Sequence, residues 1–114
     1  MLEVYQNQGF ELNEPDYVIQ GLGFIGTCGS FPEQYDIIWT DNGVKYQVGY
    51  VRLRGGYFAV YFPDVDIETK PLHSTTFIGC NKGSFDCEES RLIYLDIAAR
   101  FIKQALDDLS QGGS

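Results

Sequence analysis

The stretch YDIIWTDNGVKYQVGYVRLRGGYFAVYF, residues 35–62, decides the fold class of this 114-residue chain. It holds three runs that are rich in aromatic and β-branched residues, which favour strands, and two glycine-containing reversals separate the runs. Asn42 and Gly43 predict a type I′ turn, because both central residues of that turn need a positive φ. Gly55 and Gly56 mark the second reversal. The stretch therefore predicts a meander of three antiparallel strands.

Gly49 interrupts the middle run, and the apolar side of the run changes across it. A change of side within a strand indicates a β-bulge, because one extra residue reverses the alternation of side chains. Weaker strand patterns lie at residues 2–6, 17–25 and 75–79. Together these segments predict a sheet of five to seven strands.

One long helix is predicted over residues 86–109. Asp86 and Glu89 have the spacing of a capping box, in which each side chain bonds a free amide of the first turn. Ile93 and Ile97 break the pattern, because they lie on the polar side of the helix and need a second covering surface, such as a homodimer contact or an N-terminal loop. The apolar half of the helix comprises Leu92, Leu95, Ala98, Ala99, Phe101, Ile102, Ala105, Leu106 and Leu109.

These elements predict an α+β fold, an antiparallel sheet or small barrel of five to seven strands packed against one long C-terminal helix. The order of elements resembles that of pleckstrin-homology-like domains, a resemblance that implies no function. Residues 1–83 are β-rich, and residues 110–114 form a glycine-containing tail that we expect to be flexible. No repeat or linker divides the chain, so residues 1–114 form one domain.

Acidic residues dominate the first 41 positions. Seven carboxylates precede Lys45, the first basic residue, whereas nine acidic and eight basic residues follow from Lys45 onward. Seven of the eight net negative charges therefore belong to this block. Such a block attracts cations and basic surfaces and repels phosphates, which disfavours direct binding of nucleic acid.

The charge asymmetry predicts a non-catalytic binding protein that docks onto a basic partner protein. An immunity protein or a phage-type inhibitor of a nucleic-acid-processing enzyme has this character, because its carboxylates stand in for phosphates. Aromatic side chains near the block are the best anchors of such a contact. The predicted carboxylates are Glu11, Glu14, Asp16, Glu33, Asp36 and Asp41, and the predicted anchors are Phe10, Tyr17, Phe31 and Tyr35.

Several other features bear on the class of protein. The chain has three cysteines, an odd number that is typical of a reducing compartment, and its N-terminus lacks the pattern of a signal peptide. Its longest uncharged stretch is broken by glycines, which excludes a membrane span there. We therefore expect a cytoplasmic protein, of the host cell in the viral case.

An alternative function is a small enzyme or metal-dependent protein that uses Asp64, Asp66 and Glu68 with His73 or Cys87. The acidic triplet offers hard oxygen ligands, but it lacks the glycine and the final glutamate that an EF-hand loop requires. The charged triplet also suits an edge strand that is protected against pairing with other chains. We therefore predict no metal and no cofactor.

A glycine motif completes the list of candidates. Gly21, Gly23 and Gly26 match the G-x-G-x-x-G pattern of dinucleotide sites. The residues after Gly26 cannot form the helix that such a site requires, so we interpret these glycines as relief of crowding in a curved strand or loop.

Overall fold

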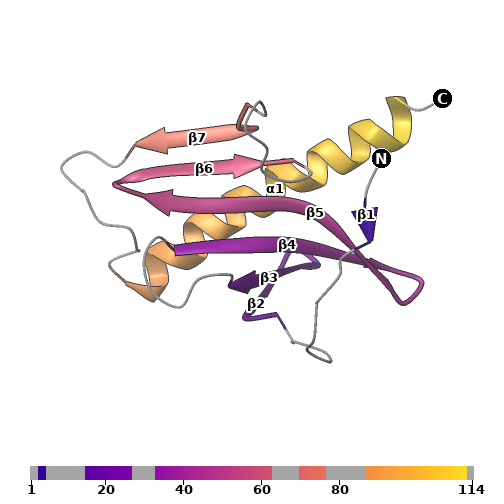
Figure 1. Cartoon of the computed structure of the whole chain (residues 1–114), viewed down its shortest axis with the longest axis horizontal. Coiled ribbons are helices and arrows are strands. Elements are labelled where there is room, and N and C mark those ends of the chain that lie inside the picture. Colours follow the sequence, from indigo (N-terminus) through magenta and orange to yellow (C-terminus); the bar gives the residue numbers. More distant parts are fainter. Residues whose placement is uncertain (1–2, 5–14, 27–32, 63–69, 77–86, 113–114) are drawn as a thin grey trace.

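The computed structural model describes residues 3–4, 15–26, 33–62, 70–76 and 87–112, which form one sheet and one long helix (Figure 1). The sheet has the order β2-β3-β4-β5-β6-β7, and β1 pairs with β5 beside this path. All of these pairs are antiparallel. The elements are β1 (Glu3–Val4), β2 (Tyr17–Ile19), β3 (Leu22–Gly26), β4 (Glu33–Asp41), β5 (Val44–Arg54), β6 (Tyr57–Tyr61), β7 (His73–Thr76) and α1 (Glu88–Gly112).

This arrangement confirms the predicted α+β fold and the predicted meander, which is β4-β5-β6. The two outer strands of the described sheet, β2 and β7, do not pair with each other, so the sheet is open and is not a barrel. The helix lies against one face of the sheet and crosses its strands obliquely (Figure 1). Among the described residues, no helix combines the length and the apolar character that a bilayer crossing requires.

Three tight hairpin turns join the strands. In the predicted turn, Asn42 has a φ of 52° and Gly43 a φ of 78°. In the second turn, Gly55 has a φ of 59° and Gly56 a φ of 80°. Such pairs of positive φ values are those of type I′ turns. A third turn was not predicted: Gln20 (56°) and Gly21 (79°) reverse the chain between β2 and β3. The predicted single strand over residues 17–25 is therefore wrong, because this turn divides it into a hairpin.

The predicted bulge lies where β5 passes under α1. Ile37 pairs with Gly49 and Ile38 with Gln47, so Val48 is the extra residue on β5. A Cβ atom built on Gly49 would lie 2.6 Å from Cδ1 of Ile102 in α1. The absence of a side chain at this position therefore allows the helix to approach the strand closely.

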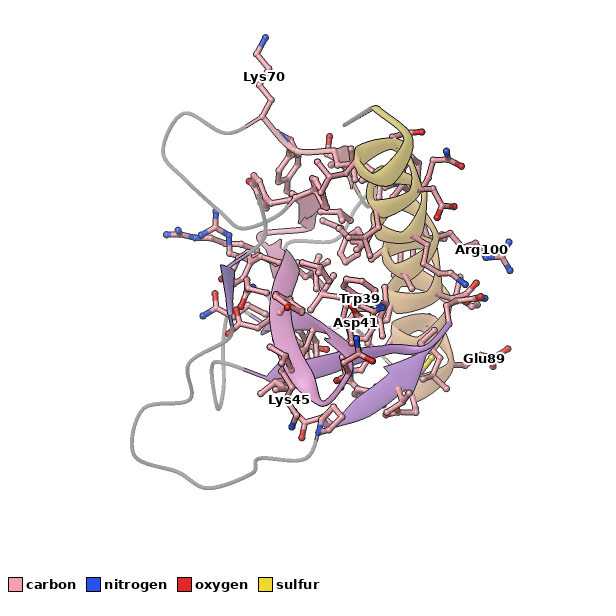
Figure 2. All side chains as sticks on the ribbon, turned by 90° about the vertical axis from the view of Figure 1, so that its right-hand side faces the viewer. Trp39, Asp41, Lys45, Lys70, Glu89 and Arg100 are labelled. Atoms are coloured by element: carbon pink, nitrogen blue, oxygen red, sulfur yellow. The ribbon has the colours of Figure 1, made fainter. Side chains whose placement is uncertain are left out.

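The main core fills the space between the sheet and α1. Figure 2 shows Trp39 pointing from β4 toward the helix, whereas Arg100 points away from the sheet. The buried side chains of this core are Leu22, Phe24, Tyr35, Ile37, Val48, Val51, Leu53, Phe58, Val60, Leu95, Ala98, Ala99 and Ile102. Side chains alternate along each strand, so a second group of side chains points to the other face of the sheet. Among them, Tyr50, Ala59 and Tyr61 form a smaller buried cluster.

The sheet covers a narrower stripe of α1 than the predicted apolar half. Leu92, Phe101 and Leu109 are 42%, 38% and 43% exposed, so these three were assigned to the core incorrectly. Leu92 and Phe101 lie at the margins of the covered stripe, and Leu109 lies near the C-terminal end of the helix. Ile93 is 53% exposed, as expected for its place on the polar side, and Ile97 is partly buried.

The two ends of α1 also differ from the prediction. Asp86, the predicted cap, lies outside the described residues, and the helix begins at Glu88, which places Cys87 at the N-cap. At the other end the helix continues to Gly112, so residues 110–112 belong to the helix and not to a flexible tail.

Candidate functional site

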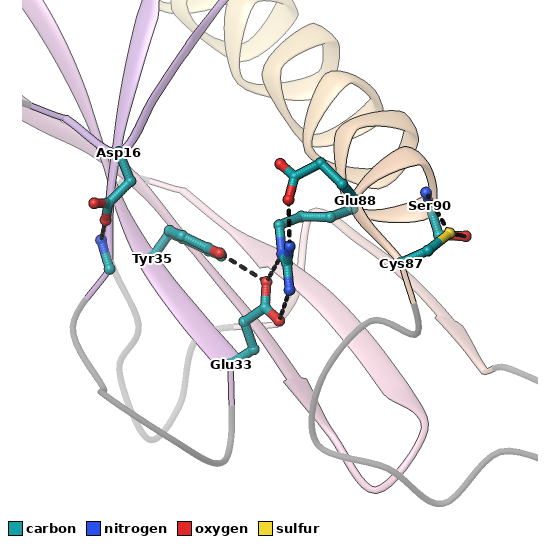
Figure 3. A network of polar contacts seen from close by, with 8 residues as sticks. Asp16, Glu33, Tyr35, Cys87, Glu88 and Ser90 are labelled. Carbon is teal, nitrogen blue, oxygen red and sulfur yellow. Dashed lines mark hydrogen bonds and ion pairs between the residues drawn. The ribbon is translucent and has the colours of Figure 1, made fainter.

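An ion-pair network lies at the start of α1 (Figure 3). The guanidinium of Arg91 donates to both carboxylate oxygens of Glu33, with Nε–Oε2 and Nη2–Oε1 distances of 2.6 and 3.0 Å, and its Nη1 lies 2.7 Å from Oε2 of Glu88. The hydroxyl of Tyr35 donates to Glu33 Oε2 at 2.7 Å. The side chains of Glu33 and Arg91 are only 11% and 21% exposed. Two-point pairs of this kind are strong and directional, so the network fixes the helix to β4.

The network changes the titration of its members. Burial, and then donation to Glu33, raises the pKa of Tyr35 well above its ordinary value. Burial and hydrogen bonding to Glu88 likewise raise the pKa of Tyr17. The hydrogen bonds to Glu33 raise the pKa of Arg91. Both phenols therefore stay protonated and the guanidinium stays charged, which suits a structural role.

Asp16 lies next to this network. Its Oδ2 accepts a hydrogen bond from the amide of Gly26 at 2.7 Å, which connects the start of β2 to the end of β3. Gly26 pairs in turn with Tyr35, whose hydroxyl reaches Glu33. Three carboxylates, those of Asp16, Glu33 and Glu88, therefore lie near one another on the helix side of this end of the molecule. Glu89 follows Glu88 and points outward from α1 (Figure 2). We call these four residues the acidic end.

The cations near the acidic end determine how much of its negative charge is neutralised. On its helix side, among the described residues, Arg91 is the one cation that bonds to these carboxylates. Arg52 and Arg54 lie near the same end of the sheet, but strand alternation places them on the opposite face, because Leu53 between them packs in the main core. The excess of carboxylates is thus confined to the helix side.

The other predicted contact residues do not join one surface. Asp36 lies on the face turned away from α1, with the amide of Gln47 at 3.5 Å. Asp41 is exposed at the far end of β4. It follows Glu33 by eight residues, which is about 26 Å along a strand. The predicted block is therefore divided among different surfaces. Glu11, Glu14, Phe10 and Phe31 lie outside the described residues.

The aromatic residues Tyr17 and Tyr35 are not exposed anchors. Tyr35 is 8% exposed and belongs to the main core. Tyr17 is partly buried and meets Tyr35 edge to face, with ring centroids 6.0 Å apart. Strand alternation turns both side chains toward the helix, and this leaves Tyr35 too buried to serve as the predicted anchor.

Exposed apolar side chains lie close to the acidic end instead. Leu92 (42% exposed) and Ile93 (53% exposed) follow Glu89 by three and four residues, and Asp96 follows three residues after Ile93. Residues at these spacings are neighbours on a helix surface. We call Glu89, Leu92, Ile93 and Asp96 the α1 stripe. Leu92 was missed because the helical pattern assigns it to the core, while Ile93 was singled out by its place on the polar side.

The residues of the alternative enzyme are not brought together where the structure describes them. The ring of His73 stacks on Phe101, with centroids 4.5 Å apart. Phe101 follows Cys87 by fourteen residues, which is about 21 Å along a helix. The described residues contain no group of three side chains able to hold a metal ion. Asp64, Asp66 and Glu68 lie outside the described residues.

Cys87 has a local structural role. Its Sγ accepts the amide of Ser90 at 3.5 Å and lies 3.4 Å from the Ser90 hydroxyl, as a side chain at an N-cap does. These hydrogen bonds with Ser90 lower the pKa of the exposed thiol.

Comparison with known proteins adds no assignment. The chain matches no protein-family model, and neither a curated protein nor a solved structure resembles it significantly. Its function must therefore be argued from its own side chains.

Proposed function

We propose that this protein is a non-catalytic binding protein that docks onto the basic surface of a partner protein through the acidic end and the α1 stripe. The observation that supports the proposal most is that carboxylates from three separate segments lie at one end of the molecule, next to exposed Leu92 and Ile93 on α1. An interface commonly combines an apolar centre with a charged rim. The cluster and the stripe supply these two parts on one side of the molecule.

The charge of the acidic end favours a basic partner. Asp16, Glu88 and Glu89 are exposed, and Glu33 is already neutralised by Arg91. Exposed carboxylates steer a basic protein during its approach and add little to the final affinity. Enzymes that process nucleic acids present basic surfaces of this kind, and an immunity protein or a phage-type inhibitor would use these carboxylates as phosphate mimics. We place the protein in the cytoplasm, or the host cytoplasm, because its three cysteines suit a reducing compartment.

The apolar part of the stripe makes the contact durable. Burying an exposed leucine or isoleucine side chain contributes about 1.5–3 kcal/mol at most. The stripe therefore determines mainly the dissociation rate, whereas the carboxylates determine the association rate. This division of roles can be measured.

The first experiment is a pull-down from source lysate with the immobilised protein, at low and at high salt. A partner retained at low salt and released at high salt is the expected result. The association rate with that partner is then measured for Asp16→Lys/Glu89→Lys. The control is Asp108→Lys, the same type of change near the other end of α1.

The charge-reversed variant should associate several-fold more slowly and show a weaker dependence on salt, while the control should behave like the parent protein. Ile93→Lys should instead accelerate dissociation. An unchanged association rate and an unchanged salt dependence in the charge-reversed variant would show that the acidic end only aids solubility.

A second copy of the chain is the competing occupant of the stripe. Sedimentation of Ile93→Lys/Ile97→Lys against the parent protein distinguishes the two. A parent that sediments as a dimer and a variant that sediments as a monomer would assign the stripe to self-association and would overturn the proposed hetero-contact at this surface.

A further inference from the structure

A pocket lies under the C-terminal half of α1, away from the acidic end. Its volume is about 510 Å³, which falls within the range of about 300–1,000 Å³ that is usual for small-molecule sites. Lys103, on its rim, follows Glu89 by fourteen residues, or about 21 Å along the helix. The pocket is lined by Gln20, Gly21, Leu22, Trp39, Lys103, Leu106, Asp107 and Leu109.

The floor and walls of the pocket are apolar. Leu22 is almost fully buried, and Leu106 and Trp39 are partly buried against the core. The Trp39 ring meets Tyr46, with centroids 5.9 Å apart, and it points toward α1 (Figure 2). An indole in such a wall offers a large, flat surface, against which aromatic and aliphatic groups pack well.

The β2–β3 turn is held in place beside this floor. The side-chain amide of Gln20 donates to Oδ1 of Asp96 in α1 at 2.9 Å, and Asp96 also pairs with Arg100 at 2.9 Å. The turn itself needs the positive φ of Gly21. The turn that lines the pocket is therefore fixed to α1 by contacts within the protein, so its position does not depend on a ligand.

The rim carries two opposite charges. Lys103 and Asp107 are exposed and lie one helical turn apart. Among the described residues, neither makes an ion pair with the other or with a third side chain. The pocket thus offers an ammonium and a carboxylate side by side at the mouth of an apolar cavity.

We propose that this pocket binds a small zwitterion with a large apolar body, of the class of the aromatic amino acids. The ring of the ligand lies against Trp39 and Leu106, its carboxylate meets Lys103, and its ammonium meets Asp107. Charge complementarity supports this class, because a ligand with one charge would leave one of the two rim groups without a partner. The pocket and the proposed docking surface share one contact, the hydrogen bond between Gln20 and Asp96. None of the variants proposed for either surface changes these two residues, so either proposal can fail alone.

Trp39 is the only tryptophan in the chain, so its fluorescence reports on the pocket. Phenylalanine, phenethylamine and 3-phenylpropionate share one apolar body and differ in charge, and none of them absorbs at the red edge of the indole band. Each is titrated into the full chain while Trp39 emission is recorded, and calorimetry provides a second readout. We expect phenylalanine to bind about three- to tenfold more tightly than either single-charge probe, which is the size of a partly exposed charged contact.

Two rim variants test the assigned contacts. Lys103→Gln should reduce the affinity for phenylalanine to that for phenethylamine, and Asp107→Asn should reduce it to that for 3-phenylpropionate. Lys70→Gln and Asp108→Asn make the same changes of charge outside the pocket, and we expect both controls to bind like the parent protein.

Three results would overturn the proposal. The first is the absence of binding by all three probes, and the second is equal affinity for the three. The third is a rim variant that binds phenylalanine like the parent protein, because the charges would then take no part in recognition.

Discussion

Replacing Gly49 by alanine tests how closely α1 packs on the sheet. The new Cβ atom would lie 2.6 Å from Cδ1 and 3.1 Å from Cγ1 of Ile102, and 3.1 Å from the carbonyl oxygen of Tyr61. Ile102 is fully buried, so its side chain has little room to move away. The substitution therefore requires the helix, the strand or the isoleucine to shift.

The magnitude follows from two opposing effects. Overpacking a core in this way costs about 1–3 kcal/mol. Alanine also reduces the conformational freedom of the unfolded chain, which stabilises the fold by about 0.4–1 kcal/mol. We expect Gly49→Ala to lower the free energy of unfolding by about 1–2 kcal/mol, as measured by urea denaturation with circular dichroism and Trp39 fluorescence.

A second substitution identifies the contact that is responsible. Ile102→Val removes the Cδ1 atom and costs about 0.5–1.5 kcal/mol alone. In the double variant the shortest contact is gone. The cost of the double variant should therefore be smaller, by about 1 kcal/mol, than the sum of the costs of the two single variants. A Gly49→Ala variant as stable as the parent, or two costs that simply add, would refute the close packing of α1 on β5.

Four further predictions concern stability and reactivity. Ile102→Ala should lower the free energy of unfolding by about 2–5 kcal/mol in denaturation experiments. Arg100→Ala loses a mostly exposed ion pair and should lower it by less than about 1 kcal/mol. Equal losses would contradict the observed burial of Ile102. Folding raises the pKa of Tyr35, so the stability that this residue contributes is complete below its unfolded pKa of about 10 and decreases as the pH rises above that value. Tyr35→Phe should therefore lose less stability at alkaline pH than the parent protein. An identical loss in the two proteins would contradict the raised pKa. The thiol of Cys87 should be alkylated at lower pH in the folded protein than in urea, as followed by mass spectrometry of its peptide, and equal pH profiles would argue against the hydrogen bonds of the N-cap. The fold should withstand EDTA and reductant, and unfolding upon chelation, seen by circular dichroism, would restore the metal-dependent alternative.

Local patterns in the sequence were sufficient for most of the fold. The β4-β5-β6 meander, the turn at Asn42 and the bulge beside Gly49 were all predicted, because strand alternation and turn chemistry act over a few residues. The Gln20 turn was missed, because glutamine seldom adopts a positive φ and gives a weak turn signal. The long helix was predicted within two or three residues of its observed ends.

The candidate site depended far more on tertiary structure. Glu33 and Arg91 are 58 residues apart in the chain, so no local pattern could predict that Arg91 neutralises this carboxylate. The burial of Tyr35 and the exposure of Leu92 likewise depend on how far the sheet extends beneath the helix.

By itself, the sequence determined the class of elements, their order, most of the turns and the total charge, since each of these depends on composition or on neighbouring residues. Only the tertiary structure decided where the charges lie. A continuous acidic block becomes divided when it forms strands, because neighbouring side chains point to opposite faces and the two ends of β4 are about 26 Å apart. The acidic end and the pocket at Trp39 exist because α1 brings its two halves against different strands, a placement set by long-range packing.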